Sequence, residues 1–307
     1  MTGIILVDGV NIFTEYGVFV TTNGYNGLLS FPPLKTPNFV DWAERDGIEV
    51  DLSNPVLDSK TFQIAFSATA NNSDIGGLMV LLENQSYHTI SFQDLNISKI
   101  LRLVSGVSYT GFLGGIRFFD LEFADDFPID NTIYRTHSIS TVVPLQGYAL
   151  DGIDMSRYGI FILEGTQAEM LKSPAIKQQQ TVNIQSLPGL IYDGGIAPVY
   201  KQKDVKLNLL MKCTNVAQFH TNWNGLIYKL ITPGLKHLSA NSLGMIYPKN
   251  LCHYKNSEII EFILRPNGQV FCQFSLTLVF TAFRPSADYI NYIPVGTFPT
   301  IFDNTFL

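Results

Sequence analysis

The chain repeats one pattern at a nearly constant distance, and this repeat constrains the fold more than any other feature. LVDGVNIFTEYGVFV stands near the start, and ALDGIDMSRYGIFIL begins at Ala149. Asp8-Gly9 recurs 143 residues later as Asp151-Gly152, and Tyr16-Gly17 recurs after 142 residues as Tyr158-Gly159. Each copy continues into an alternating apolar strand. Self-similarity at a fixed period indicates a duplicated structural unit.

Further matches extend the repeat in the same order. LKTP at Leu34–Pro37 matches LKSP at Leu171–Pro174, an offset of 137, and Asp46–Asp51 matches Pro188–Asp193 at 142. Gly115 matches Gly268 at 153. We interpret these matches as a tandem duplication of a domain of about 140 residues. The alternative is two unrelated β domains that share common turn residues.

Hydrophobic periodicity predicts strands and one helix in each copy. Thr61–Ala68 and Asp204–Lys212 alternate apolar and polar residues, as half-buried strands do. In the second copy, apolar residues from Val216 to Leu230 recur at helical spacing, with Thr214 or Asn215 as N-cap and Pro233-Gly234 as the stop. The corresponding helix of the first copy, SDIGGLMVLLEN, is shorter, and its two glycines weaken it.

These elements predict a mainly β protein of two tandem antiparallel β-sandwich or barrel domains, each with one flanking α-helix. We place the first domain at residues 1–145, the second at 146–283, and a C-terminal arm at 284–307. The arm is aromatic and interrupted by prolines. We expect it to dock on this chain or on the next one.

Composition adds two constraints. Charged residues make up 15% of the chain, against roughly 25% in ordinary soluble domains, which indicates surface covered by other subunits. The charge is also uneven. Residues 1–145 carry 7 Lys/Arg and 16 Asp/Glu, whereas residues 146–307 carry 13 and 10, so the two halves face different neighbours.

Neither targeting nor disulfide signals are visible. We expect no signal peptide, because the first residues lack a basic start and reach Asp8 early. No segment approaches the roughly 18 apolar residues of a membrane span. The three cysteines, Cys213, Cys252 and Cys272, lack C-x-x-C spacing, so we expect core thiols of a protein that folds in a reducing cytoplasm.

The search for chemistry yields no catalytic, cofactor-binding or metal-binding residues. The histidines at positions 88, 137, 220, 237 and 253 form no metal pattern, and His220 is expected to be structural. Asp125-Asp126 fits a solvated loop better than a cation site. Tyr16 and Tyr158 fit packing positions at tight corners better than carbohydrate-stacking positions. GFLGGI lacks the Lys-Ser/Thr of a phosphate loop. We therefore expect no enzyme and no cofactor.

The arrangement resembles phage tail proteins of the distal-tail and baseplate-hub group. DGIDMSRYGIFI followed by LPGLIYDGG, a strand, an amphipathic helix ending in TPGLKHL and a closing strand carry the resemblance, with DWAERDGIEVDLSNP in the first copy. The family's domain is the tail-tube fold, a small β-sandwich or barrel with a flanking helix. The resemblance spans both copies, to about residue 283, and its motifs are mostly turn chemistry.

The resemblance implies a virion structural protein of the tail tip, assembled in the bacterial host cytoplasm. Its partners would be further copies in a homo-oligomeric ring, either a trimer with six tube-like domains or a hexamer. The tail tube protein would lie above and tip or receptor-binding proteins below, and DNA would pass through without specific binding. A typical distal tail protein has one tube domain, so two copies resemble a baseplate hub more closely.

Two other functions remain open. A β-sandwich module that binds a host surface or carbohydrate would need exposed aromatic residues at one loop end, and the aromatic residues are dispersed in the sequence. An enzyme on a β scaffold would need a catalytic constellation, which the motifs do not supply.

Overall fold

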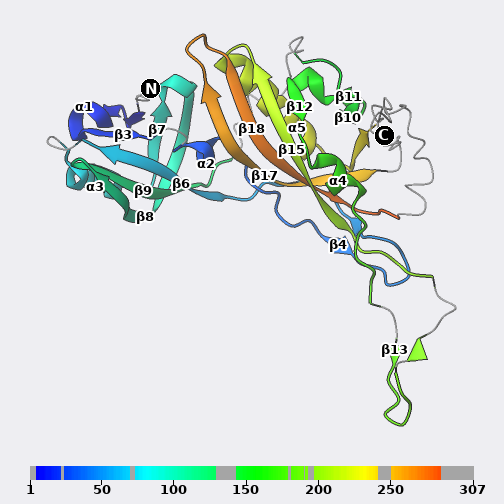
Figure 1. The fold of residues 1–307 in the computed structure, drawn as a ribbon. Helices are drawn as coiled ribbons and strands as arrows, with labels where there is room; N and C mark the ends of the chain where they lie inside the picture. Colours follow the sequence, from blue (N-terminus) through cyan, green and yellow to red (C-terminus); the bar gives the residue numbers. More distant parts are fainter. Residues whose placement is uncertain are drawn as a thin grey trace, which may run out of the picture.

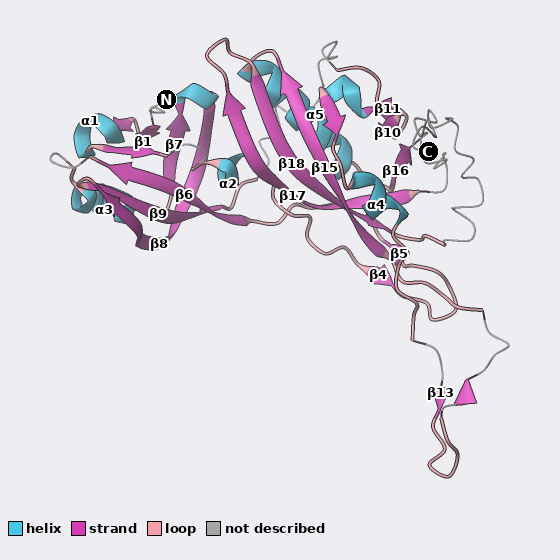
Figure 2. Ribbon diagram, viewed as in Figure 1, coloured by secondary structure: helices cyan, strands magenta, loops and turns pink. Residues whose placement is uncertain are grey.

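The computed structural model describes residues 5–21, 24–69, 73–128, 143–178, 181–189, 191–192, 197–240 and 250–284. Its architecture is mainly β, with two large antiparallel sheets that lie side by side in Figure 1 and short helices around them in Figure 2. This confirms the expected fold class. The predicted arm at 284–307 lies outside the described residues, except for Arg284.

The first sheet has seven strands in the order β2-β1-β7-β8-β9-β6-β3. Its strands are β2 (Val10–Asn11), β1 (Ile5–Val7), β7 (His88–Phe92), β8 (Ile97–Leu113), β9 (Ile116–Asp125), β6 (Lys60–Ala68) and β3 (Val18–Val20). The helices of this half are α1 (Ile12–Tyr16), α2 (Asn26–Leu29), α3 (Ile75–Glu83) and the 3-10 turn η1 (Gln93–Leu95).

The second sheet repeats that order with β11-β10-β16-β17-β18-β15-β12. Its strands are β11 (Ile153–Asp154), β10 (Tyr148–Leu150), β16 (Lys236–Ala240), β17 (Leu251–Leu264), β18 (Val270–Phe280), β15 (Lys203–Cys213) and β12 (Ile160–Ile162). The helices are η2 (Met155–Tyr158), α4 (Thr166–Leu171) and α5 (Val216–Ile231). One strand order used twice supports the duplication, while the domain limits remain predictions.

Each half also sends out a small two-stranded hairpin. In the first half it is formed by β4 (Phe39–Val40) and β5 (Glu49–Val50), and in the second by β13 (Thr181–Val182) and β14 (Ile191–Tyr192). Phe39 pairs with Val50 and Thr181 pairs with Tyr192, so the two hairpins share one register at an offset of 142. The expected match between Asp46–Asp51 and Pro188–Asp193 is therefore confirmed.

The long strands match residue by residue, and we call residues at the same register position counterparts. Lys60 at the start of β6 is opposite Asp125, and Lys203 at the start of β15 is opposite Phe280. The bulges of the next strand match as well. β8 shifts register between Leu103 and Ser105, and β17 shifts between Tyr254 and Asn256. This register makes Val104 the counterpart of Lys255, and Phe112 that of Phe262.

One expected match is wrong. Leu34 forms an isolated β-bridge with Leu57. The second half has the corresponding bridge between Ile176 and Tyr200, so the counterpart of Leu34 is Ile176. The true offset is therefore 142, and PPLK matches PAIK. LKTP and LKSP are not structurally equivalent, because Leu171 ends a helix, whereas Leu34 lies in an extended segment. Gly115 lies in the turn between β8 and β9, and Gly268 lies in the corresponding turn between β17 and β18. By the register of β9 and β18, however, the two glycines are two positions away from being counterparts.

The core lies between each sheet and its helix. In β15, Val205, Leu207, Leu209 and Met211 are all buried, which confirms the alternation read from the sequence. Helix α5 begins after its N-cap Asn215, and Phe219 and Leu230 on its inner face are buried. Helix α3 begins after Asp74 and is shorter, as its glycines predicted.

Candidate functional site

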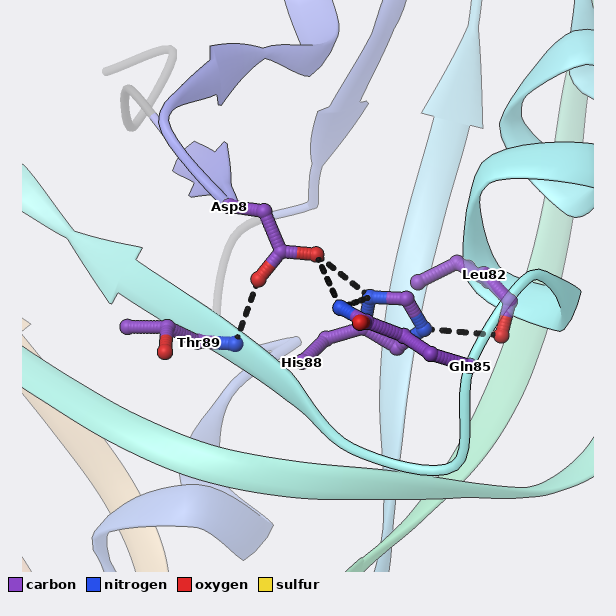
Figure 3. Close-up of polar contacts among 5 residues, drawn as sticks. All are labelled: Asp8, Leu82, Gln85, His88 and Thr89. Carbon is purple, nitrogen blue, oxygen red and sulfur yellow. Dashed lines mark hydrogen bonds and ion pairs between the residues drawn. The ribbon is translucent and has the colours of Figure 1, made fainter.

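The repeated Asp-Gly pair forms the tight turn of the hairpin β1–β2, at the site drawn in Figure 3. Asp8 and Gly9 have φ values of 50° and 85°, as a two-residue hairpin of this twist requires. The Asp8 carboxylate turns back onto β7. It accepts hydrogen bonds from the Thr89 N–H at 2.8 Å and the Gln85 amide at 2.9 Å, and it contacts His88 Nδ1 at 2.6 Å.

The buried His88 ring links this turn to the end of helix α3. Its Nε2 lies 2.9 Å from the Leu82 carbonyl oxygen, so both ring nitrogens face oxygen acceptors. Partial burial alone would raise the pKa of Asp8, but hydrogen bonds from His88 and Thr89 and the charge of His88 outweigh it and lower that pKa. The contacts of this Asp-His pair are with Gln85 and backbone groups. Its geometry is that of a structural corner.

The second half builds the same corner with a lysine. Asp151 has a φ of 47° and accepts the His237 N–H at 2.7 Å. Lys236 stands at the position of His88, and its Nζ donates to the carbonyl oxygens of Thr232 and Pro233 just after helix α5. A basic group at a helix C-terminus satisfies free carbonyls and complements the helix dipole. The repeated motif therefore fastens a hairpin turn to a helix end.

The other residues considered from the sequence also have structural places. Tyr158 is buried and Tyr16 is partly buried, each directly before a glycine with positive φ. The three thiols are free and buried. Asp125 does not lie in a solvated loop, because it ends β9, is buried and pairs with Lys99 at 2.6 Å. Asp126 pairs with Arg102 at 2.8 Å.

The described residues include neither a metal-ligating cluster nor a membrane-spanning helix. His137 lies outside them, and the part of the chain that the structure describes holds no group of three metal-ligating residues. Among these residues, no helix is long and apolar enough to cross a bilayer.

The most extensive site that the structure assembles is the junction between the halves. Residues 26–34 of the first half run along the edge of β17. The Leu34 N–H donates to the Lys255 carbonyl at 2.8 Å, and the Asn26 amide donates to the Ile260 carbonyl at 3.0 Å. Between them, Ser30 Oγ accepts the Ile259 N–H at 2.8 Å. The first half thus acts as an edge partner for a strand of the second.

An aromatic cluster closes the junction from the helix side. The ring of Trp223 lies 4.8 Å from Phe274 of its own sheet and 5.5 Å from Phe31 of the first half, centroid to centroid. Its Nε1 donates to the Leu29 carbonyl at 3.1 Å. Trp223 therefore faces the core of its own half, as the helical spacing of the apolar residues from Val216 to Leu230 indicates, and it also anchors the other half. His220 has a similar role, since its Nε2 lies 2.6 Å from the Leu95 carbonyl oxygen.

The hairpin β4–β5 makes a second contact with the other half, centred on Lys177. The buried Lys177 Nζ donates to the carbonyl oxygens of Trp42, Arg45 and Gly47, each at 2.7 Å, and it pairs with the Asp41 carboxylate. One ammonium group therefore binds four residues of the hairpin loop.

Backbone contacts and an ion pair complete this second contact. The Gly47 N–H donates to the Tyr200 carbonyl at 2.8 Å, and Asp46 binds Arg284 at 2.6 Å. Partial burial alone would raise the pKa of Asp46, but hydrogen bonds from Arg284 and the Tyr200 N–H lower it. At Gly47, with a φ of 68°, a Cβ would lie 1.6 Å from the Thr281 carbonyl oxygen. Only glycine fits this approach.

A small cavity of about 150 Å³ lies between this hairpin and β17. It is lined by residues that include Phe39, Val50, Tyr254 and His253. Burial lowers the pKa of His253 to about 4, and its Nδ1 has no hydrogen-bond partner among the described residues. The junction therefore holds this imidazole in its neutral form at physiological pH.

The comparisons with known proteins assign no family. No protein-family model matches the chain, and no curated protein sequence matches it significantly.

Sequence reasoning missed the junction. Its one sequence signal is the PPLK and PAIK match, which places Lys35 and Lys177 at the same register position.

Proposed function

We propose that the protein is a structural component of a phage tail tip, a distal tail or baseplate hub protein that forms a ring around the DNA channel. Such a ring would join the tail tube above to the tip or receptor-binding proteins below, and it would be part of the virion. The low charged fraction and the resemblance of the repeated motifs to tail-tube domains support this proposal.

The observation that carries it is the way the halves are joined. Two domains of one strand order contact each other through different surfaces, the segment 26–34 of one and the β17 edge of the other. A contact between different surfaces of like units is heterologous, and its repetition makes a ring when the rotation closes. The duplicated chain would then supply two neighbouring positions of that ring.

The overall charge fits a channel through which DNA slides. Protein–DNA affinity comes largely from Lys and Arg contacts with phosphates. A formal net charge of −6 favours passage over tight binding.

Light scattering coupled to size-exclusion chromatography, followed by electron microscopy, tests the proposal. We expect a ring with a central opening and a mass that is a multiple of 34.2 kDa. A monomer at every concentration, including in the presence of the neighbouring tail proteins, would reject it.

One observation favours the second candidate, a module that binds carbohydrate or a host surface. Tyr109 and Phe112 stack with centroids 5.7 Å apart, and both side chains are exposed near the tip of the β8–β9 hairpin. Exposed aromatic faces are a common platform for sugars. Glycan-array binding that is lost in Tyr109→Ala, with a monomeric protein, would support this candidate over the ring.

A further inference from the structure

The first half has the same kind of strand edge as the one that it covers in the second half, and no described residue of the chain pairs with this edge. We propose that a second copy of this chain binds there. Its residues 168–177 would lie along β8, and its β13–β14 hairpin would grip Lys35. This inference rests on the proposed ring and specifies the contact between its subunits.

The donor side of the contact is already in place at Ile176. Leu34 and Ile176 form the same isolated bridge, and in each case the neighbouring residues use their backbone groups within the half. The Leu34 N–H points across the junction to the Lys255 carbonyl. No described residue accepts a hydrogen bond from the Ile176 N–H, and the Ile176 side chain is 52% exposed. Ile176 therefore has the same position as Leu34 within its half, but no described strand accepts its N–H.

The acceptor side is the free edge of β8. Strand β7 pairs with β8 only as far as Leu101, and β16 leaves β17 at the counterpart position, Cys252. Beyond that point the β17 edge is covered by the first half, whereas no described residue pairs with the β8 edge. An open edge of this length is a ready template for another strand.

Apolar side chains on β8 support the same occupant. Val104, the counterpart of Lys255, and Phe112, the counterpart of buried Phe262, are exposed, and so is Tyr109, the counterpart of buried Ile259. Phe112 is 69% exposed. By register, the Ile176 N–H of one copy would donate to the Val104 carbonyl of the next.

The hairpin β13–β14 supplies the second half of the contact. In the first half the corresponding hairpin loop wraps Lys177 with three carbonyl oxygens and a carboxylate. The counterpart of Lys177 is Lys35, which is exposed. The loop 183–189 projects far from both sheets in Figure 1, and its Ile184 and Leu187 are exposed. A loop of the same register would wrap the Lys35 of the next copy.

Charge favours this pairing of surfaces. The half that would receive the second copy has a formal charge of −9, and the half that would dock has +3. Opposite charges speed encounter and select orientation. Repeating the contact alternates first and second halves around a ring, so three copies would present six similar sheets.

Full-length variants test the proposed contact, with assembly measured by light scattering and folding measured by thermal unfolding. Ile176→Asp, Phe112→Asp and Lys35→Glu should each raise the concentration needed for assembly at least about tenfold, as loss of an interface anchor does. Their folding should match the wild type, because all three side chains are exposed in the single chain. Val80→Asp is the matched control. Val80 lies on the exposed face of α3 and should leave assembly unchanged.

A cross-linking arm makes the contact itself visible. Chains with Ile176→Cys mixed with chains with Val104→Cys should join through a short bis-maleimide, and neither variant alone should do so, because the native thiols are buried. If the wild type is a monomer throughout, the proposed ring is rejected. If the ring forms but all three charge variants assemble normally and no cross-link appears, the ring stands and this contact is rejected.

Discussion

Replacing Lys177 with methionine tests the central contact of the junction. Methionine keeps an unbranched apolar stem but removes the ammonium group, which has three N–H donors. Lys177 is 7% exposed, and its Nζ serves the carbonyls of Trp42, Arg45 and Gly47 together with Asp41. The substitution therefore leaves the loop without its common donor.

The expected cost follows from these contacts. Asp41 is 46% exposed on its side chain, so water can replace its lost partner and its share is small. The three carbonyls lose charge-assisted bonds that contribute roughly 1.5–3 kcal/mol each when taken singly, and such terms do not add. Breaking a buried charge cluster by removing one member costs about 3–5 kcal/mol, and we expect a loss of this size.

Urea unfolding followed by circular dichroism measures the loss, and limited proteolysis of the β4–β5 hairpin measures undocking. Lys201→Met is the control, because Lys201 is exposed nearby and a surface substitution should change stability by less than about 0.5 kcal/mol. The reasoning fails if Lys177→Met unfolds within about 1 kcal/mol of the wild type and its hairpin resists protease equally.

Three further predictions concern the same regions. Gly47→Ala should destabilise the protein far more than Gly114→Ala in urea unfolding. Both positions have positive φ, but only at Gly47 would the added Cβ lie 1.6 Å from a backbone oxygen, that of Thr281; equal losses would contradict the close approach. The His253 pKa is lowered by burial to about 4, so the unfolded chain binds one more proton between about pH 4 and 6.5, and stability should rise with pH across that window. If the urea midpoint of His253→Gln rises with pH as steeply as that of the wild type, the effect comes from another group. Burial raises the pKa of all three cysteine thiols, so maleimide should label none of them until urea unfolds the protein, and rapid labelling of the native protein would disprove the burial.

Local chemistry made parts of the fold predictable. Two-residue hairpin turns require positive φ at two successive positions, and Asp-Gly is one of the few residue pairs that adopt it, so Asp8-Gly9 and Asp151-Gly152 carry a local turn signal. The alternation of β15 and the caps of α5 are also written in neighbouring residues. Such features depend on residues a few positions apart, and the structure confirms the predicted alternation of β15 and the N-cap of α5.

The junction could not be predicted in this way. Its contacts join residues more than 120 positions apart, as between His220 and Leu95 or between Trp223 and Leu29, and no period marks them. A lysine in an exposed-looking stretch such as PAIKQ is normally read as solvated, yet Lys177 is buried by a loop of the other half. The false match between LKTP and LKSP shows the same limit, because three identical residues out of four concealed a helix end in one copy and an extended segment in the other.

The two copies differ mainly where the proposed assembly would need them to differ. The contact within the chain is permanent, so large side chains such as Trp223, Tyr254 and Phe31 can be buried there from the moment of folding. The counterpart contact between chains would form only on assembly, and each subunit must stay soluble before then. The β8 edge has Val104 in place of Lys255 and an exposed Phe112, and this apolar surface would be covered by the neighbour in the proposed assembly. Because no described residue pairs with this edge, its occupation by a neighbour would determine when the proposed ring closes.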